Sequence, residues 1–227
     1  MNLHRRAVAE FVGTAFLVAT VIGSGIAASR LSPTDIGLQL LENSLITGAA
    51  LVALILTLQP VSAAFNPVVS GVEAALGLIS WREAGILALA QTSGGVLGAV
   101  VANLMFDLDA VRFSEHARSG GGLWLGEVVA TLGLVVIVFG AIRAGRTETI
   151  AYAVGGYITA AYWFTSSTSF ANPAVTVARM FSDTFAGIKP DSVPMFVLMQ
   201  VIGGALALGL VRILYPTPTQ LPEGNTR

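Results

Sequence analysis

The sequence predicts an all-α polytopic membrane protein with six transmembrane helices and two re-entrant half-helices in an inverted repeat. Of its 227 residues, 54% are hydrophobic and 11% are charged, and the mean hydropathy is +0.77. A typical soluble domain has about a quarter of its residues charged. An Asn-Pro pair begins a short apolar segment in each half of the chain, and other polar landmarks recur around each pair in the same order.

Six apolar runs approach the ~20 residues that a helix needs to cross a bilayer. They lie at about 8–29, 40–60, 83–106, 123–142, 149–168 and 193–214. Two further segments, about 66–78 and 172–182, are too short to cross and are expected to be half-helices surrounded by protein. The first run contains Glu10 and has no clear small-residue cleavage site after it, which argues against a cleaved signal peptide.

Each Asn-Pro pair predicts the start of a helix. Asn is a strong N-cap, and Pro suits the first helical turn because its missing N–H needs no partner there. If both half-helices begin in the middle of the membrane, their positive dipole ends and two carboxamides favour small neutral molecules over cations and protons. The alternative is two ordinary Asn-Pro turns, which the matched surroundings disfavour. The predicted pore centre consists of Asn66, Pro67, Val68, Asn172, Pro173 and Ala174.

The same landmarks occur in both halves of the chain. The corresponding pairs are Glu10 and Glu127, Thr14 and Thr131, Gln91 and Gln200, and the diglycines that begin at Gly94 and Gly203. Three spans per half is an odd number, so the second half is expected to be inverted relative to the first. The predicted organisation is a first repeat at 1–119, a second repeat at 120–215 and a disordered cytoplasmic tail at 216–227.

Glu10 and Glu127 lie within apolar spans, where a carboxylate is costly and a functional role is the default. One role is a proton relay. The other is loop bracing, in which each carboxylate accepts hydrogen bonds from unpaired N–H groups of the broken loop before its half-helix. The duplicated positions mirror the duplicated loops and therefore favour bracing.

The basic residues predict the orientation in the membrane. Those that fall on one side are His4, Arg5, Arg6, Arg82, Arg143, Arg146 and Arg212. The positive-inside rule makes this side cytoplasmic, which places both termini in the cytoplasm. The net charge of −1 gives no indication of a nucleic-acid partner. No phosphate-binding loop or cluster of metal ligands is recognisable, so neither a cofactor nor enzymatic activity is expected.

The Asn-Pro motifs, the Glu-x-x-x-Thr openings and the inverted halves together resemble the major intrinsic protein family, the aquaporins and glycerol facilitators, over nearly the whole chain. The resemblance implies a homotetramer in which each subunit has its own pore for water or small uncharged solutes. In most members an Arg follows the second Asn-Pro-Ala and helps to form the narrowest point. Here that residue is Val175, which implies a wider and more apolar constriction.

The resemblance also implies the other constriction residues. The position on the second span falls at Thr47, and the position on the fifth span falls at Tyr157, or at Ala160 if the alignment has no gap. Arg179, one turn beyond Val175, is expected either to reach the outer vestibule or to pair with Asp183.

The segment 165–176 resembles a bacterial subgroup associated with arsenic resistance, in which Val replaces the constriction Arg. It implies passage of arsenous acid and of methylated arsenicals through a bacterial inner membrane. The expected function is thus a passive channel for small neutral solutes, with a water or glycerol facilitator as the alternative. A gradient-coupled transporter would use the same repeats, and a structural junction protein would need longer loops.

Overall fold

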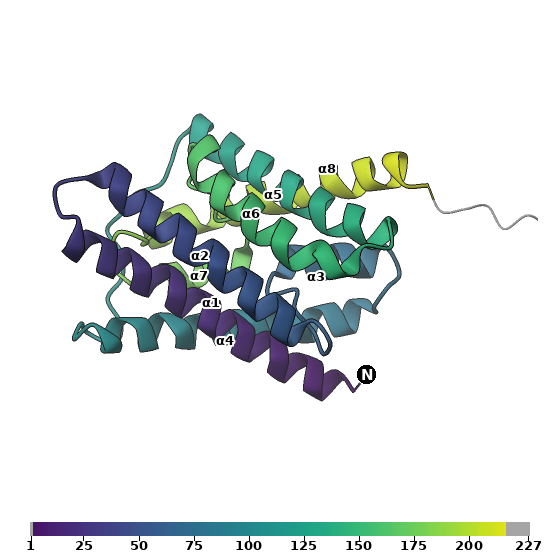
Figure 1. Ribbon diagram of the computed structural model, residues 1–227, viewed down its shortest axis with the longest axis horizontal. Helices are drawn as coiled ribbons and strands as arrows, with labels where there is room; N and C mark the ends of the chain where they lie inside the picture. Colours follow the sequence, from purple (N-terminus) through teal and green to yellow (C-terminus); the bar gives the residue numbers. More distant parts are fainter. Residues whose placement is uncertain (1, 217–227) are drawn as a thin grey trace, which may run out of the picture.

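The computed structural model describes residues 2–216 and is entirely helical there, apart from the connecting loops. The α-helices are α1 (Leu3–Leu31), α2 (Ile36–Leu58), α3 (Pro67–Ala75), α4 (Trp81–Met105), α5 (Gly121–Arg143), α6 (Ile150–Phe164), α7 (Pro173–Arg179) and α8 (Val193–Leu214). The long helices run side by side, and the short α3 and α7 lie between them, on opposite halves of the bundle (Figure 1). The tail predicted at 216–227 lies outside the described residues, except for residue 216.

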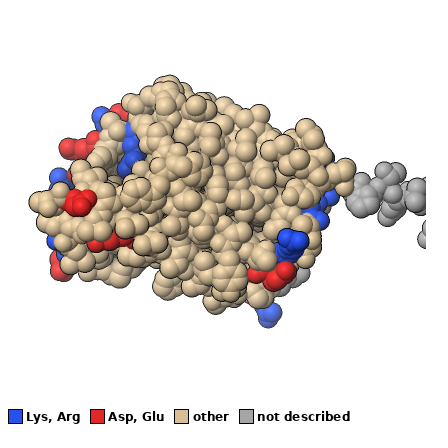
Figure 2. All heavy atoms as spheres, turned by 45° about the horizontal axis from the view of Figure 1, so that its top comes forward, with Lys and Arg blue, Asp and Glu red and all other residues tan. Residues whose placement is uncertain are grey.

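Most of the predicted spans are helices that can cross a membrane. By length and hydropathy, α1, α2, α4, α5 and the segment that ends with α8 qualify. On the face in Figure 2 the charged side chains gather at the two ends of the molecule and leave a band without charge between them, which suits the interior of a bilayer. The chain is therefore a multi-pass membrane protein.

The predicted fifth span, 149–168, is wrong at its carboxyl end. The helix α6 has 15 residues and ends at Phe164, although a short 3-10 turn at Thr147–Thr149 precedes it. Beyond it, Thr165 is extended, and Thr168, Ser169 and Ala171 have positive φ angles of 60°, 52° and 49°. The chain leaves the helix early because these residues form the irregular loop that leads into α7.

The half-helices begin where the Asn-Pro pairs predict but are shorter than expected. Asn66 and Asn172 are their N-caps, and a proline occupies the first turn of each. Against predicted bounds of 66–78 and 172–182, α3 has nine residues and α7 has seven. Gly77, with a φ of 74°, follows the end of α3 and turns the chain away, as glycine does after many helices.

The inverted repeat is visible in how the helices pack. In the first half α1 packs against α2 and α4, and in the second half α5 packs against α6 and α8. Glycines allow the close approach. A Cβ atom added to Gly94 or Gly98 on α4 would collide with the backbone of α1, and one added to Gly203 on α8 would lie 2.6 Å from the carbonyl oxygen of Val128 on α5.

Replacing Gly98 with valine is expected to destabilise the protein strongly. The new Cβ would overlap the carbonyl oxygen of Ala15, and helix backbone cannot move as a flexible side chain can. Overpacking of this kind costs about 1–3 kcal/mol or more. Gly85→Val is the matched control, because Gly85 lies on the same helix and has nothing within 4 Å of the added atom. Equal unfolding temperatures of the two variants in detergent would contradict this view of the α1–α4 contact.

Candidate functional site

The two half-helices meet through reciprocal hydrogen bonds at the centre of the bundle. The Nδ2 atom of Asn66 donates to the carbonyl oxygen of Ala171 at 2.7 Å, and that of Asn172 donates to the carbonyl oxygen of Phe65 at 2.7 Å. Phe65 and Ala171 have φ angles of 48° and 49°, a left-handed conformation that turns each carbonyl out of the regular chain direction. The N-termini of α3 and α7 are thus fixed against each other.

Each asparagine performs three functions with one carboxamide. Its Oδ1 atom caps its own half-helix, accepting from the N–H of Val68 at 2.9 Å for Asn66 and from the N–H of Ala174 at 3.0 Å for Asn172. One hydrogen of its NH₂ group bonds the opposite loop. An amide NH₂ carries two hydrogens, and the second has no partner among residues 2–216, while both asparagines line a cavity. The site therefore holds two fixed donors at the positive ends of two helices.

The cavity next to these asparagines is narrow and has two kinds of wall. Its volume of about 80 Å³ is enough for several water molecules, because one water needs ~10–15 Å³ of such space. The apolar wall includes Leu17, Val21, Leu51, Ile55, Val69, Leu134, Val138, Ile150, Val154, Ile158 and Val175. The polar side chains on the lining are Thr47, Asn66, Tyr162, Ser169, Asn172 and Arg179. Such a lining suits a solute that has hydroxyl groups but no charge.

The structure places two of the three predicted constriction residues, Thr47 and Val175, on this cavity and places Tyr157 elsewhere. The hydroxyl of Tyr157 donates to carbonyl oxygens of α5, at 3.1 Å for that of Ala130, and its ring lies over Gly133. Tyr157 is therefore not among the residues that line this cavity. The alternative, Ala160, is also absent from the described lining.

The side chain from α6 that faces Thr47 is Tyr162. Its hydroxyl lies 3.3 Å from the Oγ1 atom of Thr47. The cavity-facing residues of α6 are Ile150, Val154, Ile158 and Tyr162, spaced four apart. A position one residue before Ile158 points about 100° away on a helix of 3.6 residues per turn. The four-residue spacing is the signal in the sequence for this face, whereas Tyr157 and Ala160 rest on the family resemblance.

Arg179 also lies on the cavity, and it does not pair with Asp183. The carboxylate of Asp183 instead lies 3.4 Å from Nε of Arg112 and accepts from the N–H of Glu115 at 3.0 Å. The Nε atom of Arg179 donates to the carbonyl oxygen of Ala186. Of the two expectations for Arg179, pairing with Asp183 is therefore wrong, and the guanidinium lies on the cavity one turn beyond Val175.

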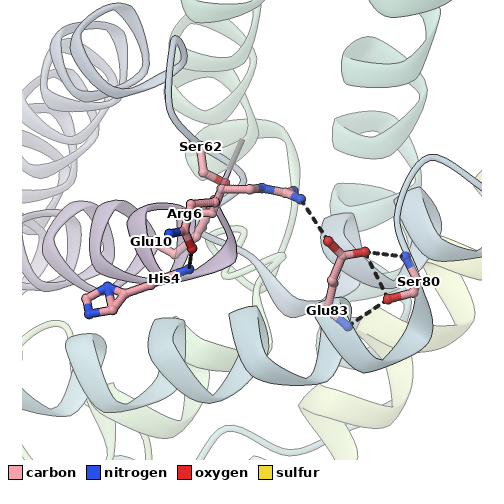
Figure 3. A network of polar contacts seen from close by, with 7 residues as sticks. His4, Arg6, Glu10, Ser62, Ser80 and Glu83 are labelled. Carbon is pink, nitrogen blue, oxygen red and sulfur yellow. Dashed lines mark hydrogen bonds and ion pairs between the residues drawn. The ribbon is translucent and has the colours of Figure 1, made fainter.

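Glu10 is completely buried and accepts four hydrogen bonds, three of them from the loop before α3. The donors are the hydroxyl of Ser62 at 2.5 Å, the N–H groups of Ala64 and Phe65 at 2.9 and 2.6 Å, and Nε2 of Gln91 at 2.8 Å. Figure 3 shows Glu10 near Ser62, at the end of the molecule where Arg6 of α1 pairs with Glu83 of α4 at 3.9 Å. These contacts hold the loop in place.

Glu127 repeats this geometry in the second half. It is completely buried and accepts from the N–H groups of Phe170 and Ala171, both at 2.9 Å, and from Nε2 of Gln200 at 2.5 Å. The amide of Gln200 also donates to Thr176 on α7 at 2.8 Å. The matched contacts of the two carboxylates arise because the sequence repeat is also a structural repeat.

Two capped half-helices that meet within a membrane-crossing bundle, next to a narrow half-polar cavity, are the features of a membrane channel. The chain belongs to the major intrinsic protein family, whose pattern matches residues 1–149 and again residues 143–226.

Individual relatives agree with this membership. Aquaglyceroporin AqpS from Rhizobium meliloti (strain 1021) is 48% identical over 214 residues, which cover 94% of this chain and 91% of that protein. The probable aquaporin TIP2-2 of Oryza sativa subsp. japonica is 28% identical over 229 residues, covering 96% and 90%.

Two solved structures share the fold. The X-ray structure of the aquaglyceroporin from Plasmodium falciparum superposes with a TM-score of 0.73 at 16% identity and covers 95% of this chain and 98% of its own. An FNT family ion channel superposes with a TM-score of 0.53 at 15% identity, covering 92% and 90%. At these identities the likeness concerns the fold alone.

Proposed function

We propose that this chain is a passive channel for small uncharged polyol-like solutes, with arsenous acid and glycerol as substrates. The observation that carries the proposal is the lining: two fixed carboxamide donors and the hydroxyls of Thr47 and Tyr162 face an apolar wall. The high identity to a protein named as an aquaglyceroporin supports the solute class. A water-selective facilitator is the alternative within the same class.

Arsenous acid resembles a polyol in the respect that matters for this cavity. It is neutral at neutral pH and carries hydroxyl groups that both donate and accept hydrogen bonds. Asn66 and Asn172 can replace part of its hydration on one side, while the apolar wall offers no competing partner. Val175 lacks the long side chain that an arginine would extend into the cavity, which leaves room for methylated arsenicals.

The surroundings of Glu10 and Glu127 favour passive conduction over gradient coupling. A proton-coupled transporter needs a carboxylate that gains and loses a proton as the protein changes shape. Here both carboxylates accept bonds from backbone N–H groups that have no other acceptor, so protonation would disrupt the loops that hold α3 and α7. We therefore propose bracing as their role.

The substitution Val175→Arg is expected to reduce the flux of arsenous acid and glycerol about tenfold, the effect of ~1.4 kcal/mol on the barrier. A guanidinium at this position would occupy the lumen next to Asn172. Stopped-flow light scattering on proteoliposomes measures the flux of water, glycerol, arsenous acid and a methylated arsenical. Val175→Leu adds volume without charge and is the control. Unchanged arsenous acid flux in Val175→Arg would refute a selecting role for this position, and uptake that requires an ion gradient would indicate a transporter.

We also propose a homotetramer in a bacterial inner membrane, with both termini in the cytoplasm. The N-terminus and the end of α8 lie at the same end of the molecule (Figure 1), where Arg5, Arg6 and Arg212 are found. Reporter fusions to each end that are active only in the cytoplasm test the orientation. Light scattering of the detergent-solubilised protein tests the tetramer.

A further inference from the structure

A second cavity lies beyond the central one, and the two share a boundary. The outer cavity, of about 290 Å³, is formed by the start of α2, the loop that precedes α5 and the loops on either side of α7. Two side chains line both cavities, and they are Tyr162 and Arg179. A solute that moves between the central and the outer cavity therefore passes these two groups.

The guanidinium of Arg179 is held in place at this boundary. Arg179 is only 2% exposed. Its Nε atom donates to the carbonyl oxygen of Ala186, and its Cζ atom lies 3.4 Å from the centre of the Phe170 ring. The Phe170 ring in turn packs edge-on against Phe196, with centroids 5.2 Å apart. A planar group that is stacked and bonded in this way is preorganised, unlike a solvated lysine.

Among residues 2–216 no carboxylate forms an ion pair with Arg179, because the nearest candidate in sequence, Asp183, is paired with Arg112. The buried carboxylate of Glu127 interacts with Arg179 electrostatically but does not contact it. A guanidinium has five N–H donors. Only Nε has a hydrogen-bond partner among the described residues, so the N–H groups of both Nη atoms remain for a passing solute.

A second arginine contributes to the field in the outer cavity but is differently engaged. Nε of Arg118 donates to the carbonyl oxygen of Gly187 at 2.9 Å, and its Cζ atom lies 5.0 Å from the centre of the Phe170 ring. It does not line the central cavity. Arg179 is thus the guanidinium that a solute meets at the boundary.

We infer that Arg179 supplies, one helical turn further out, the cation barrier and the N–H donors that Val175 does not supply. This inference rests on the proposed function, in which the central cavity is the conduction path. Four residues of helix correspond to about 6 Å. The position that repels cations, Arg179, is consequently about one helical turn away from Val175, where the pore has room for a bulkier solute. The pore can then be open to bulkier neutral solutes without becoming permeable to cations.

The experiment measures sodium and proton leak together with glycerol flux in proteoliposomes. Arg179→Gln is expected to raise the cation leak about tenfold or more, because it removes a fixed positive charge from a low-dielectric path, while glycerol still passes. Arg179→Lys is expected to leak less than Arg179→Gln. Arg82→Gln is the matched control, since Arg82 is an exposed arginine outside both cavities and does not hold Asp183, and its leak is expected to equal that of the wild type.

Two results would overturn the inference. One is an Arg179→Gln variant that conducts glycerol but leaks no more cations than the wild type. The other is an Arg179→Lys variant that leaks cations as strongly as Arg179→Gln. Failure of the proposed function is distinguishable from both, because then the wild type itself would conduct neither glycerol nor arsenous acid.

Discussion

Replacement of Glu127 by alanine is expected to abolish solute flux and to lower the free energy of unfolding by several kcal/mol. The N–H groups of Phe170 and Ala171 would lose their acceptor in a completely buried site, and the amide of Gln200 would keep only its bond to Thr176. Each buried donor without a partner costs about 1–3 kcal/mol. The loop before α7 would then no longer hold the half-helix against α3. Glu10→Ala is expected to have an effect of the same size on the first half.

Thermal unfolding in detergent and glycerol flux in proteoliposomes check this prediction. Glu127→Gln separates bracing from proton relay, because it keeps one acceptor oxygen but cannot exchange a proton at neutral pH. Bracing predicts intermediate stability and partial flux. A relay predicts a stable protein with flux as low as in Glu127→Ala. Glu148→Ala, at an exposed carboxylate in the turn before α6, is the control and should behave as the wild type.

Alanine at Asn66 or Asn172 is expected to lower solute flux about tenfold and to destabilise the protein. Loss of an N-cap costs about 0.5–2 kcal/mol. The carbonyl oxygen of Ala171 would also lose its donor in Asn66→Ala, and that of Phe65 would lose its donor in Asn172→Ala. A solute would lose a donor where its hydration is most reduced. The loss of about 1.4 kcal/mol of stabilisation at the barrier corresponds to a factor of ten in rate.

The serine variants distinguish the two effects of this change. Serine is also a strong N-cap, but its side chain is too short to bond the opposite loop. We therefore expect Asn172→Ser to recover part of the stability lost in Asn172→Ala, as measured by thermal unfolding, without recovering its solute flux. Full flux in either serine variant would show that the carboxamide is not required at the pore centre.

The half-helix starts could be predicted because capping is local. Asn followed by Pro determines where a helix begins, and the structure has Asn66 and Asn172 as N-caps. The ends of the half-helices were less accurate, since an end depends on the tertiary contacts of the residues that follow. Gly77 marks the end of α3 by its own conformation, but no comparable residue marks the end of α7.

The end of α6 has a local and a tertiary cause. Residues 165–169, directly after Phe164, all carry hydroxyl side chains, which compete for backbone hydrogen bonds and are weak helix formers. The N–H groups of Phe170 and Ala171 then bond Glu127 on a helix distant in sequence and draw the loop into the bundle. The side of α6 that faces the cavity is that of Tyr162, and packing against the neighbouring helices determines it.

By itself, the sequence determined the fold class, the inverted repeat, the family and the two asparagines, because hydropathy, capping and internal repetition depend on residues near one another in the chain. Only the tertiary structure decided which groups line the outer pore. Arg179 was within reach of Asp183 by helical spacing, but Arg112 from a remote loop pairs with that carboxylate, and Phe170 stacks on the guanidinium. A local sequence pattern does not show that an arginine from a remote segment competes for the same carboxylate. Here Arg112 takes Asp183, and the guanidinium of Arg179 lies on the cavity.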